Sequence, residues 1–289
     1  MTLQLTLGRR IVLSVAALVA GVTLIVTVSV PGALGAYTAR ITNSANTVST
    51  NPYFTCGAAV STDPQATFSY NMDDTGTGLT MADDSGNNRP GAYSAAGVTY
   101  RQAGPCPRDS ALGATFNGST GFAYGPNTTY NPSTFSEEIW FRTSTGGGKL
   151  MGLGNSRTGT STQYDRHVYL TNAGNVVFGV YPGAVKTVQS PSTYLDNKWH
   201  HVVATQGLAT NANPGIRLYV DGALVASDST VVTNENAAEY FRVGYDNINS
   251  WGVTQPNNFY FTGTLAWAGF YATTALTPTQ VKQHYSAGV

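Results

Sequence analysis

The sequence has few charged residues, and neither sign is in excess. Asp, Glu, Lys and Arg make up only 10% of the 289 residues, and the 15 basic side chains balance the 15 acidic ones. Such a chain lacks the electrostatic field that attracts proteins to nucleic acid or anionic lipid. Its hydrophobic content of 42% is too high for a disordered protein. We therefore expect a folded protein without a nucleic-acid partner.

Long hydrophobic runs are scarce, and the clear one lies at the N-terminus. Arg9 and Arg10 precede an apolar run from Ile11 to Val30, and small residues follow at 33–36. This order is typical of a secretory signal peptide, and the run is also long enough for an uncleaved membrane anchor. We interpret 1–36 as one of these two hydrophobic helices. Either places the remainder outside the cell, secreted or on the extracellular face of the membrane, and only an uncleaved helix would contact the membrane.

Cysteine is nearly absent, since the chain holds only Cys56 and Cys106. An oxidising compartment outside the cell favours a bond between them. The even count, and the lack of a histidine-containing motif beside either residue, argue against a catalytic cysteine. We predict a disulfide between the two.

Helical patterns are also scarce, because Gly, Tyr, Thr, Ser and Asn dominate a composition typical of short strands and turns. Residues 37–65 are rich in Thr, Ser and Asn, and we expect an arm or linker there. Residues 66–289 are the expected folded domain. Within it, apolar residues alternate with other side chains along 216–220, and Asp-Gly follows at 221–222. This pattern predicts a strand and a two-residue type I′ hairpin turn.

The end of the chain carries a clear helix signal. Thr277 is placed to cap a helix, Pro278 suits its first position, and Gln280 completes a Thr-x-x-Gln capping box. We expect a short C-terminal helix.

Several phrases together resemble one domain family. Trp-His-His-Val at 199–202, followed by Leu-Tyr-Val-Asp-Gly at 218–222, closely resembles the signature of LamG-like (laminin G, concanavalin A-like lectin/glucanase) domains. Segments 81–88 and 116–119 are similar to the family's Asp-x-Ser-Gly-Asn and Phe-Asn-Gly-Ser phrases. The resemblance covers about 66–289. It implies an all-β, two-sheet jelly-roll sandwich with a short C-terminal helix. The stretch 41–47 is similar to one that follows the signal peptide in many exported actinobacterial surface proteins.

The carboxylate pattern of glycosidases on this fold is missing. One large class places its two carboxylates on alternate residues of one strand, so that both point to the same face. The comparable strand here carries Glu137 and Glu138, which are adjacent and point to opposite faces. We therefore expect no catalytic residues and no enzymatic activity.

Two phrases indicate a binding site. Tyr-Asp-Arg-His-Val-Tyr at 164–169 and Gly-Tyr-Asp-Asn-Ile-Asn-Ser-Trp at 244–251 are similar to phrases of an actinobacterial LamG subgroup. Polar groups that bond hydroxyls, beside an aromatic face that covers a sugar ring, suit carbohydrate recognition. The alternative is a structural ion pair and a packing tryptophan. The predicted ligand-binding residues are Asp165, Arg166, His167, Tyr181, Asp246, Asn247 and Trp251.

Calcium is common in LamG-like domains, which makes it the expected cofactor if there is one. It prefers six to eight oxygen ligands, and candidate oxygens gather in turn-like segments. Turn capping by Asp and Asn is the alternative explanation. Tandem histidines in a strand face opposite sides, so His200 and His201 are not expected to chelate a metal together. The predicted metal ligands are Asp83, Asp84, Asn87 and Asp246.

These observations favour an exported, non-catalytic binding module. The expected partner is carbohydrate or another cell-surface polymer, in a lectin-like or adhesive role. A structural or protein-binding component of the cell surface is the main alternative, and a polysaccharide hydrolase is the third, because this fold hosts all three.

Overall fold

The computed structural model describes residues 42–43, 46–47, 52–62, 64–109 and 112–289. The expected signal or anchor helix lies outside the described residues. The described segments contain no helix with the length and apolarity needed to span a bilayer. The chain divides into two units, 1–50 and 51–289. In the first, β1 (Thr42–Asn43) pairs antiparallel with β2 (Asn46–Thr47).

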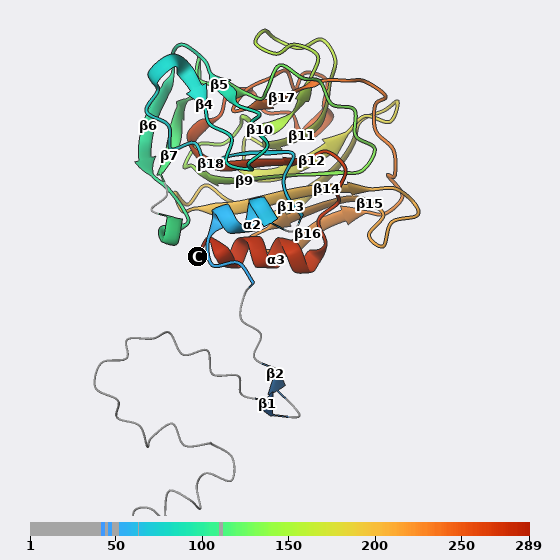
Figure 1. Ribbon diagram of the computed structural model, residues 1–289. Coiled ribbons are helices and arrows are strands. Elements are labelled where there is room, and N and C mark those ends of the chain that lie inside the picture. Colours follow the sequence, from blue (N-terminus) through green and yellow to red (C-terminus); the bar gives the residue numbers. More distant parts are fainter. Residues whose placement is uncertain (1–41, 44–45, 48–51, 63, 110–111) are drawn as a thin grey trace, which may run out of the picture. The chain divides into compact units, whose positions relative to one another are not determined.

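Antiparallel strands build two sheets in the second unit (Figure 1). In the sheet that we call the β11 sheet, the described strands run in the order β13-β12-β11-β10-β17-β8-β5-β4. Their bounds are β4 (Thr80–Met81), β5 (Gly91–Tyr93), β8 (Ala123–Tyr124), β10 (Lys149–Gly154), β11 (Tyr164–Leu170), β12 (Asn175–Val180), β13 (Lys186–Thr193) and β17 (Tyr240–Val243).

The second sheet, the β9 sheet, has the order β16-β15-β14-β9-β18-β7-β6, and β3 pairs with β18 beside it. Its strands are β3 (Phe68–Tyr70), β6 (Val98–Ala103), β7 (Leu112–Asn117), β9 (Phe135–Arg142), β14 (His200–Gly207), β15 (Gly215–Val220), β16 (Ala223–Asp228) and β18 (Thr262–Tyr271). Short 3₁₀ helices are η2 (Thr77–Leu79), η3 (Pro107–Asp109) and η4 (Gly252–Thr254).

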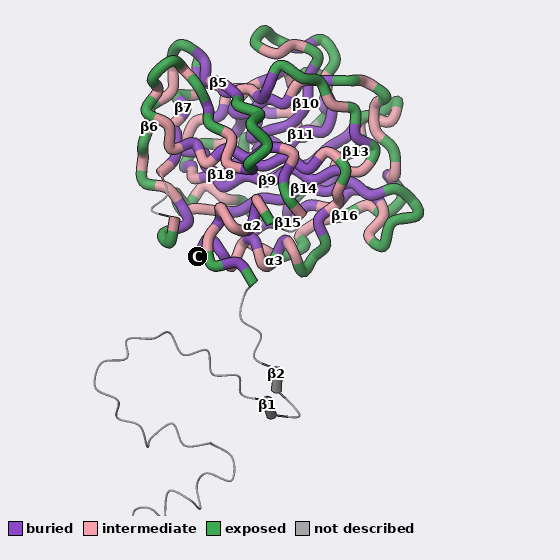
Figure 2. Tube along the Cα trace, in the orientation of Figure 1, coloured by how far each residue is buried: buried purple, intermediate pink, exposed green. Residues whose placement is uncertain are grey.

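The core lies between the two sheets. Phe135, Ile139 and Phe141 alternate along β9, and all three belong to one buried cluster with Phe178 of β12. The rings of Phe135 and Phe178 meet edge to face with their centroids 6.1 Å apart. Burying each such side chain stabilises the fold by about 1.5 to 3 kcal/mol. Figure 2 shows the result, with buried strands inside and exposed loops around them. The predicted all-β jelly-roll sandwich is confirmed.

The predicted hairpin is also confirmed. Val220 pairs with Ala223, and the two turn residues, Asp221 and Gly222, have φ angles of 52° and 76°. A type I′ turn requires positive φ at both positions, which Asp tolerates and Gly adopts freely.

Helix α3 (Pro278–Ala287) is the expected C-terminal helix. The Gln280 amide donates to the Thr277 hydroxyl (3.3 Å), and the Thr277 amide donates to the Gln280 carboxamide oxygen (2.9 Å). This is the predicted capping box. Val281 packs with Val203 of β14 on the outer face of the β9 sheet, away from the β11 sheet.

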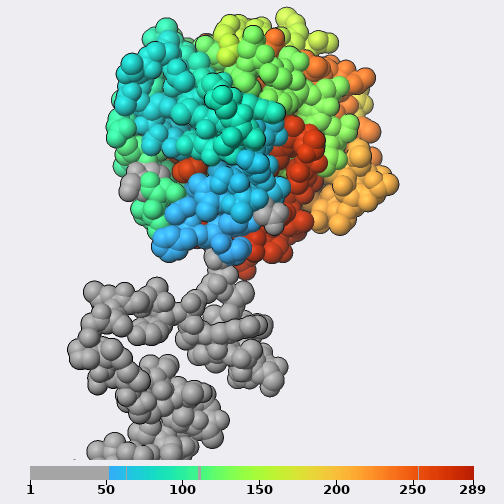
Figure 3. Space-filling view, viewed as in Figure 1, coloured from blue at the N-terminus to red at the C-terminus, as the bar shows by residue number. Residues whose placement is uncertain are grey.

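The structure differs from the sequence interpretation between residues 51 and 65. The compact unit begins at Asn51, and part of the expected arm forms helix α2 (Cys56–Thr62), which lies beside α3 (Figure 1). In the space-filling view, the atoms of the blue segment that contains α2 border those of the red C-terminal segment (Figure 3). Ala59 and Val60 are buried there. A seven-residue helix is too short to show apolar periodicity. The predicted disulfide is present and joins Cys56 to Cys106.

Candidate functional site

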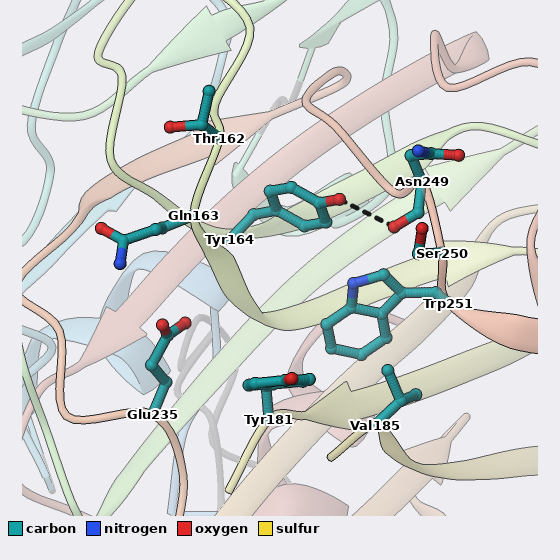
Figure 4. Close-up of a pocket in the computed structure, with 9 residues that line it drawn as sticks. All are labelled: Thr162, Gln163, Tyr164, Tyr181, Val185, Glu235, Asn249, Ser250 and Trp251. Atoms are coloured by element: carbon teal, nitrogen blue, oxygen red, sulfur yellow. Dashed lines mark hydrogen bonds between the residues drawn. The ribbon is translucent and has the colours of Figure 1, made fainter. Parts of the chain in front are cut away.

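A pocket of about 270 Å³ opens beside the outer face of the β11 sheet, which is the face opposite the core. Its walls come from the start of β11, the turn between β12 and β13, the loop before β17 and the loop after β17 (Figure 4). The lining residues are Thr162, Gln163, Tyr164, Tyr181, Val185, Glu235, Asn249, Ser250 and Trp251.

Trp251 lines one wall of the pocket and packs against the β11 sheet. Its indole packs in a buried cluster with Tyr169 and Val177 of the sheet. A side chain at Gly179 of β12 would collide with the indole ring, so this glycine lets the ring lie directly on the strand. Trp251 is therefore almost fully buried, although it still lines the pocket.

Two tyrosines supply the accessible aromatic surface. The Tyr164 hydroxyl donates to the Asn249 carbonyl (2.7 Å), which ties β11 to the loop after β17. Tyr181 is 39% exposed and lies between Glu235 and Trp251 in Figure 4. The pocket therefore combines aromatic faces with the amide and hydroxyl groups of its loops.

Asp165 positions this pocket from behind without lining it. Its carboxylate is fully buried and accepts the backbone amides of Tyr181 (2.7 Å) and Glu235 (2.8 Å). Burial raises its pKa, against the lowering effect of the neighbouring Arg166 guanidinium. The carboxylate thus fixes two lining residues from different loops at their backbones.

Arg166 is a scaffold residue as well. Its guanidinium is buried, donates to the Glu239 carboxylate (3.0 Å) and to the Ala237 carbonyl (2.9 Å), and so holds the loop before β17. Burial raises the pKa of Glu239 to about 7, although the ion pair with Arg166 opposes this. The alternative interpretation was a structural ion pair of Asp165 and Arg166, and these two groups lie 3.8 Å apart, both fully buried.

His167 lies behind the aromatic wall. Its ring centroid is 4.6 Å from that of Trp251 and 5.6 Å from that of Tyr164. Neither ring nitrogen has a hydrogen-bond partner among the described residues. Burial, followed by the nearby positive charge of Lys149, holds its pKa well below the usual range, so the ring is neutral at pH 7.

Asp246 and Asn247 fasten one loop to another. The buried Asp246 carboxylate accepts the amide (3.0 Å) and hydroxyl (2.8 Å) of Ser161, and lies 3.7 Å from the Lys149 ammonium. The Asn247 carboxamide donates to the Ser161 carbonyl (2.9 Å). Of the seven predicted ligand-binding residues, Tyr181 and Trp251 therefore line the pocket, while the other five support or flank it.

Seven of the nine lining residues were missed by the sequence interpretation, among them Ser250 of the second quoted phrase. Tyr164 and Asn249 lie within the two quoted phrases, so a wider choice from those phrases would have found them. Gln163 precedes the first phrase directly. Glu235 lies in a loop with no motif, and only the fold brings it to the pocket.

The predicted metal ligands are engaged in turns. Asp83 accepts the amides of Ser69 (3.0 Å), Ser85 (3.0 Å) and Arg89 (2.8 Å). The Asn87 carboxamide donates to the Ala66 carbonyl (2.9 Å). These bonds match the turn-capping alternative.

Asp84 and Asp246 do not add a metal cluster. Asp84 accepts the Asn71 amide (3.0 Å), and burial raises its pKa to about 6. Asp246 belongs to the separate loop described above. Among the described residues, one group of three potential ligand residues lies close enough together to hold an ion, namely Cys56, Cys106 and Asp109. The two sulfur atoms of this group already form the disulfide. Calcium binding stays a prediction.

The two adjacent glutamates of β9 do point to opposite faces. Glu138 lies under α3, where its carboxylate contacts His201 (3.1 Å) and His284 (3.0 Å). The Tyr271 hydroxyl donates to the same carboxylate (2.6 Å). Glu137 has the parity of the core residues of β9, is fully buried and has no hydrogen-bond partner for either carboxylate oxygen within the described chain.

Comparisons with known proteins agree with this fold. Domain 4 of AbnA, a GH43 extracellular arabinanase from Geobacillus stearothermophilus solved with arabinotriose, has a TM-score of 0.54 and 16% identity, covering 76% of this chain and 98% of that one. Trypanosoma rangeli sialidase with 2,3-difluorosialic acid has a TM-score of 0.50 and 16% identity, covering 76% of this chain but 32% of that one. At such identities the likeness shows the fold alone.

Sequence comparison adds the family. A search of curated protein sequences finds no match. A family profile, however, matches residues 116–282, which is more than half of the chain. With the two-sheet fold in place, the chain belongs to the concanavalin A-like lectin/glucanases superfamily.

Proposed function

We propose that this protein is an exported, non-catalytic module that binds carbohydrate of a cell surface or extracellular polymer. The pocket beside β11 is the binding site. The observation that carries the proposal is a cavity of about 270 Å³ whose lining joins three aromatic side chains to amide and hydroxyl groups. Aromatic faces cover the apolar side of a sugar ring while polar groups bond its hydroxyls.

The lining also supports binding rather than hydrolysis. Glycosidases of the usual type place two carboxyl groups across the scissile bond. The residues that line this pocket include one carboxylate, that of Glu235. A neighbouring fold, domain 4 of the arabinanase, was solved with arabinotriose, which supports a sugar ligand for this sandwich. The N-terminal sequence pattern supports export, which belongs to the same proposal.

The test is binding of the purified protein to an array of glycans and cell-wall polysaccharides, followed by titration calorimetry. Tyr181→Ala removes the exposed ring and should weaken binding roughly tenfold, which is about 1.4 kcal/mol. Phe54→Ala is the matched control, because it removes an exposed ring from the α2 side of the molecule.

Either of two results would contradict the proposed sugar site. If the folded protein binds no glycan, or if Tyr181→Ala binds as well as the parent, the pocket is not a sugar site. A protein-binding surface role would then replace this proposal. Repeating the titration with calcium and with a chelator tests the calcium prediction separately.

A further inference from the structure

The lining of the pocket carries charge of one sign. Glu235 is the single charged residue among those that line it, and its side chain is half-buried. No hydrogen bond or ion pair joins its carboxylate to another described residue, although its backbone is held by Asp165. Figure 4 shows its carboxylate beside Gln163, with Trp251 on the other side of the pocket. A half-buried carboxylate without a partner is costly, and a cationic ligand would offset that cost.

The charges behind the wall do not cancel this carboxylate. Burial and the Asp165 charge raise the pKa of Glu235, and the Arg166 charge lowers it. One amino group of Arg166 also donates to the Glu235 backbone carbonyl (3.4 Å). That guanidinium also faces two more carboxylates, those of Glu239 at 3.0 Å and Asp165 at 3.8 Å. One positive charge is therefore shared among three acidic groups.

Other basic side chains near the pocket are also unable to neutralise it. Lys149 is fully buried and lies 3.7 Å from the Asp246 carboxylate. His167 is neutral at pH 7, as described above. Lys186 is the first residue of β13 and shares the strand face of Val188, which packs in the core, and its charge acts on Asp228 of β16. Lys186 therefore points away from the pocket.

The aromatic groups favour the same ligand charge. An ammonium group close to the face of a tyrosine or tryptophan is attracted by the ring, and this attraction grows when water is excluded. Tyr181 lies next to Glu235 in the pocket. An ammonium held at this point would contact a ring face and a carboxylate together.

We propose that the pocket selects sugars that carry a free amino group over the corresponding N-acetylated, neutral or acidic sugars. This inference rests on the proposed function, since it names the ligand class of the same site. The ammonium pairs with Glu235, the ring of the sugar packs on Tyr181, and Gln163 and Ser250 are placed to bond its hydroxyls. A uronic or sialic acid would instead bring its carboxylate toward Glu235, and the two negative charges would repel each other.

The experiment compares two ligands that differ only in the acetyl group, with an acidic oligosaccharide as a third probe. The probes are β-1,4-linked glucosamine hexamers, the same hexamers fully N-acetylated, and oligogalacturonate, each titrated by calorimetry at low and high salt. We expect the amine form to bind at least tenfold more tightly than the N-acetylated form. Added salt should reduce this preference, because the charges are accessible to solvent.

Two variants locate the selectivity. Glu235→Gln keeps the shape and removes the charge, and should bring the two hexamers to within about threefold of each other. Asp73→Asn is the control, because it removes a half-buried carboxylate on the loop before β4, at the other end of the β11 sheet. Circular dichroism and the unfolding midpoint confirm that each variant is folded.

The outcomes separate the two proposals. If the N-acetylated hexamer binds as tightly as the amine form, or if Glu235→Gln leaves their ratio unchanged, the amine selectivity is overturned and sugar binding stands. If the folded protein binds neither these hexamers nor any amine-bearing glycan of the array, the selectivity is also overturned. If the folded parent protein binds no glycan at all, both proposals are overturned.

Discussion

Glu137 is the residue at which burial and charge conflict most strongly. Its carboxyl group is fully buried between the sheets and has no hydrogen-bond partner within the described chain. Burial raises its pKa well above the usual range, although Lys149 and Arg166 oppose this. The folded protein therefore holds a proton that the unfolded chain releases above about pH 4.3.

The first prediction follows from this difference. As the pH rises from about 4.3 to the raised pKa, the free energy of unfolding of the parent should fall relative to that of Glu137→Gln, by up to about 1.4 kcal/mol per pH unit. The variant mimics the protonated side chain and lacks this pH dependence. Urea unfolding of both proteins from pH 4 to pH 9 measures it. Parallel stability curves would show that the carboxyl group is ionised in the folded state.

Also at the scale of single residues, the sequence predicted only part of the pocket lining. Tyr181 and Trp251 were expected in the site and line it. Asp165, chosen from the phrase at 164–169, instead accepts backbone amides from behind the pocket. The residue type alone cannot distinguish a residue that lines the pocket from one that supports it from behind, because carboxylates and aromatic rings near loops serve in both roles. Which side of the strand each one occupies depends on the fold around it.

Helix α3 is the element that is attached to the sheet through contacts with a buried carboxylate. The Glu138 carboxylate on β9 receives His284 from the helix and His201 from β14. Burial alone would raise the pKa of Glu138, but the two histidines outweigh burial and lower it. A lowered pKa means that this group stabilises the fold above its unfolded pKa of about 4.3, and that the contribution is lost as pH falls below that value.

The second prediction is that Glu138→Gln destabilises the protein at pH 7 by about 2 to 3 kcal/mol, since two buried histidines lose their anionic partner. The loss should shrink as the pH falls below about 4.3. Urea unfolding measures it, with Glu137→Gln on the same strand as the matched control. Equal stability of Glu138→Gln and parent at pH 7 would contradict an ionic attachment of α3.

Elements differ in how far the sequence predicts them. The capping box of α3 and the Asp221-Gly222 turn depend on neighbouring residues, so their geometry could be read locally. Helix α2 could not, because seven residues with Ser and Thr have little helix propensity. Its disulfide and its packing beside α3 come from distant parts of the chain.

For the whole molecule, the disulfide between Cys56 and Cys106 closes a loop of fifty residues. In the chain-entropy model, such a link stabilises the folded state by about 4 kcal/mol. The third prediction is that reduction, or the double variant Cys56→Ala/Cys106→Ala, lowers the free energy of unfolding by about this amount. The far-UV spectrum should stay that of a β protein, because the core of the sandwich is elsewhere.

A urea titration with and without reductant measures the difference, and the double variant should no longer respond to reductant. A cysteine variant as stable as the parent would contradict the prediction. The fold at this scale followed from the sequence, because its family phrases are spread over about 66–289. The location of the pocket did not follow, since four separate segments meet there.

The positions of the two ends of the second unit carry a mechanical consequence. The segment from Pro52 into α2, and α3 with the C-terminus, lie together on the outer side of the β9 sheet (Figure 1). The pocket lies on the outer side of the other sheet. If a polymer binds in the pocket as proposed, tension between that polymer and a tether at either end of this unit would pass through the thickness of the sandwich. Such a load is shared by both sheets and their interlocked side chains, instead of peeling one strand from an edge.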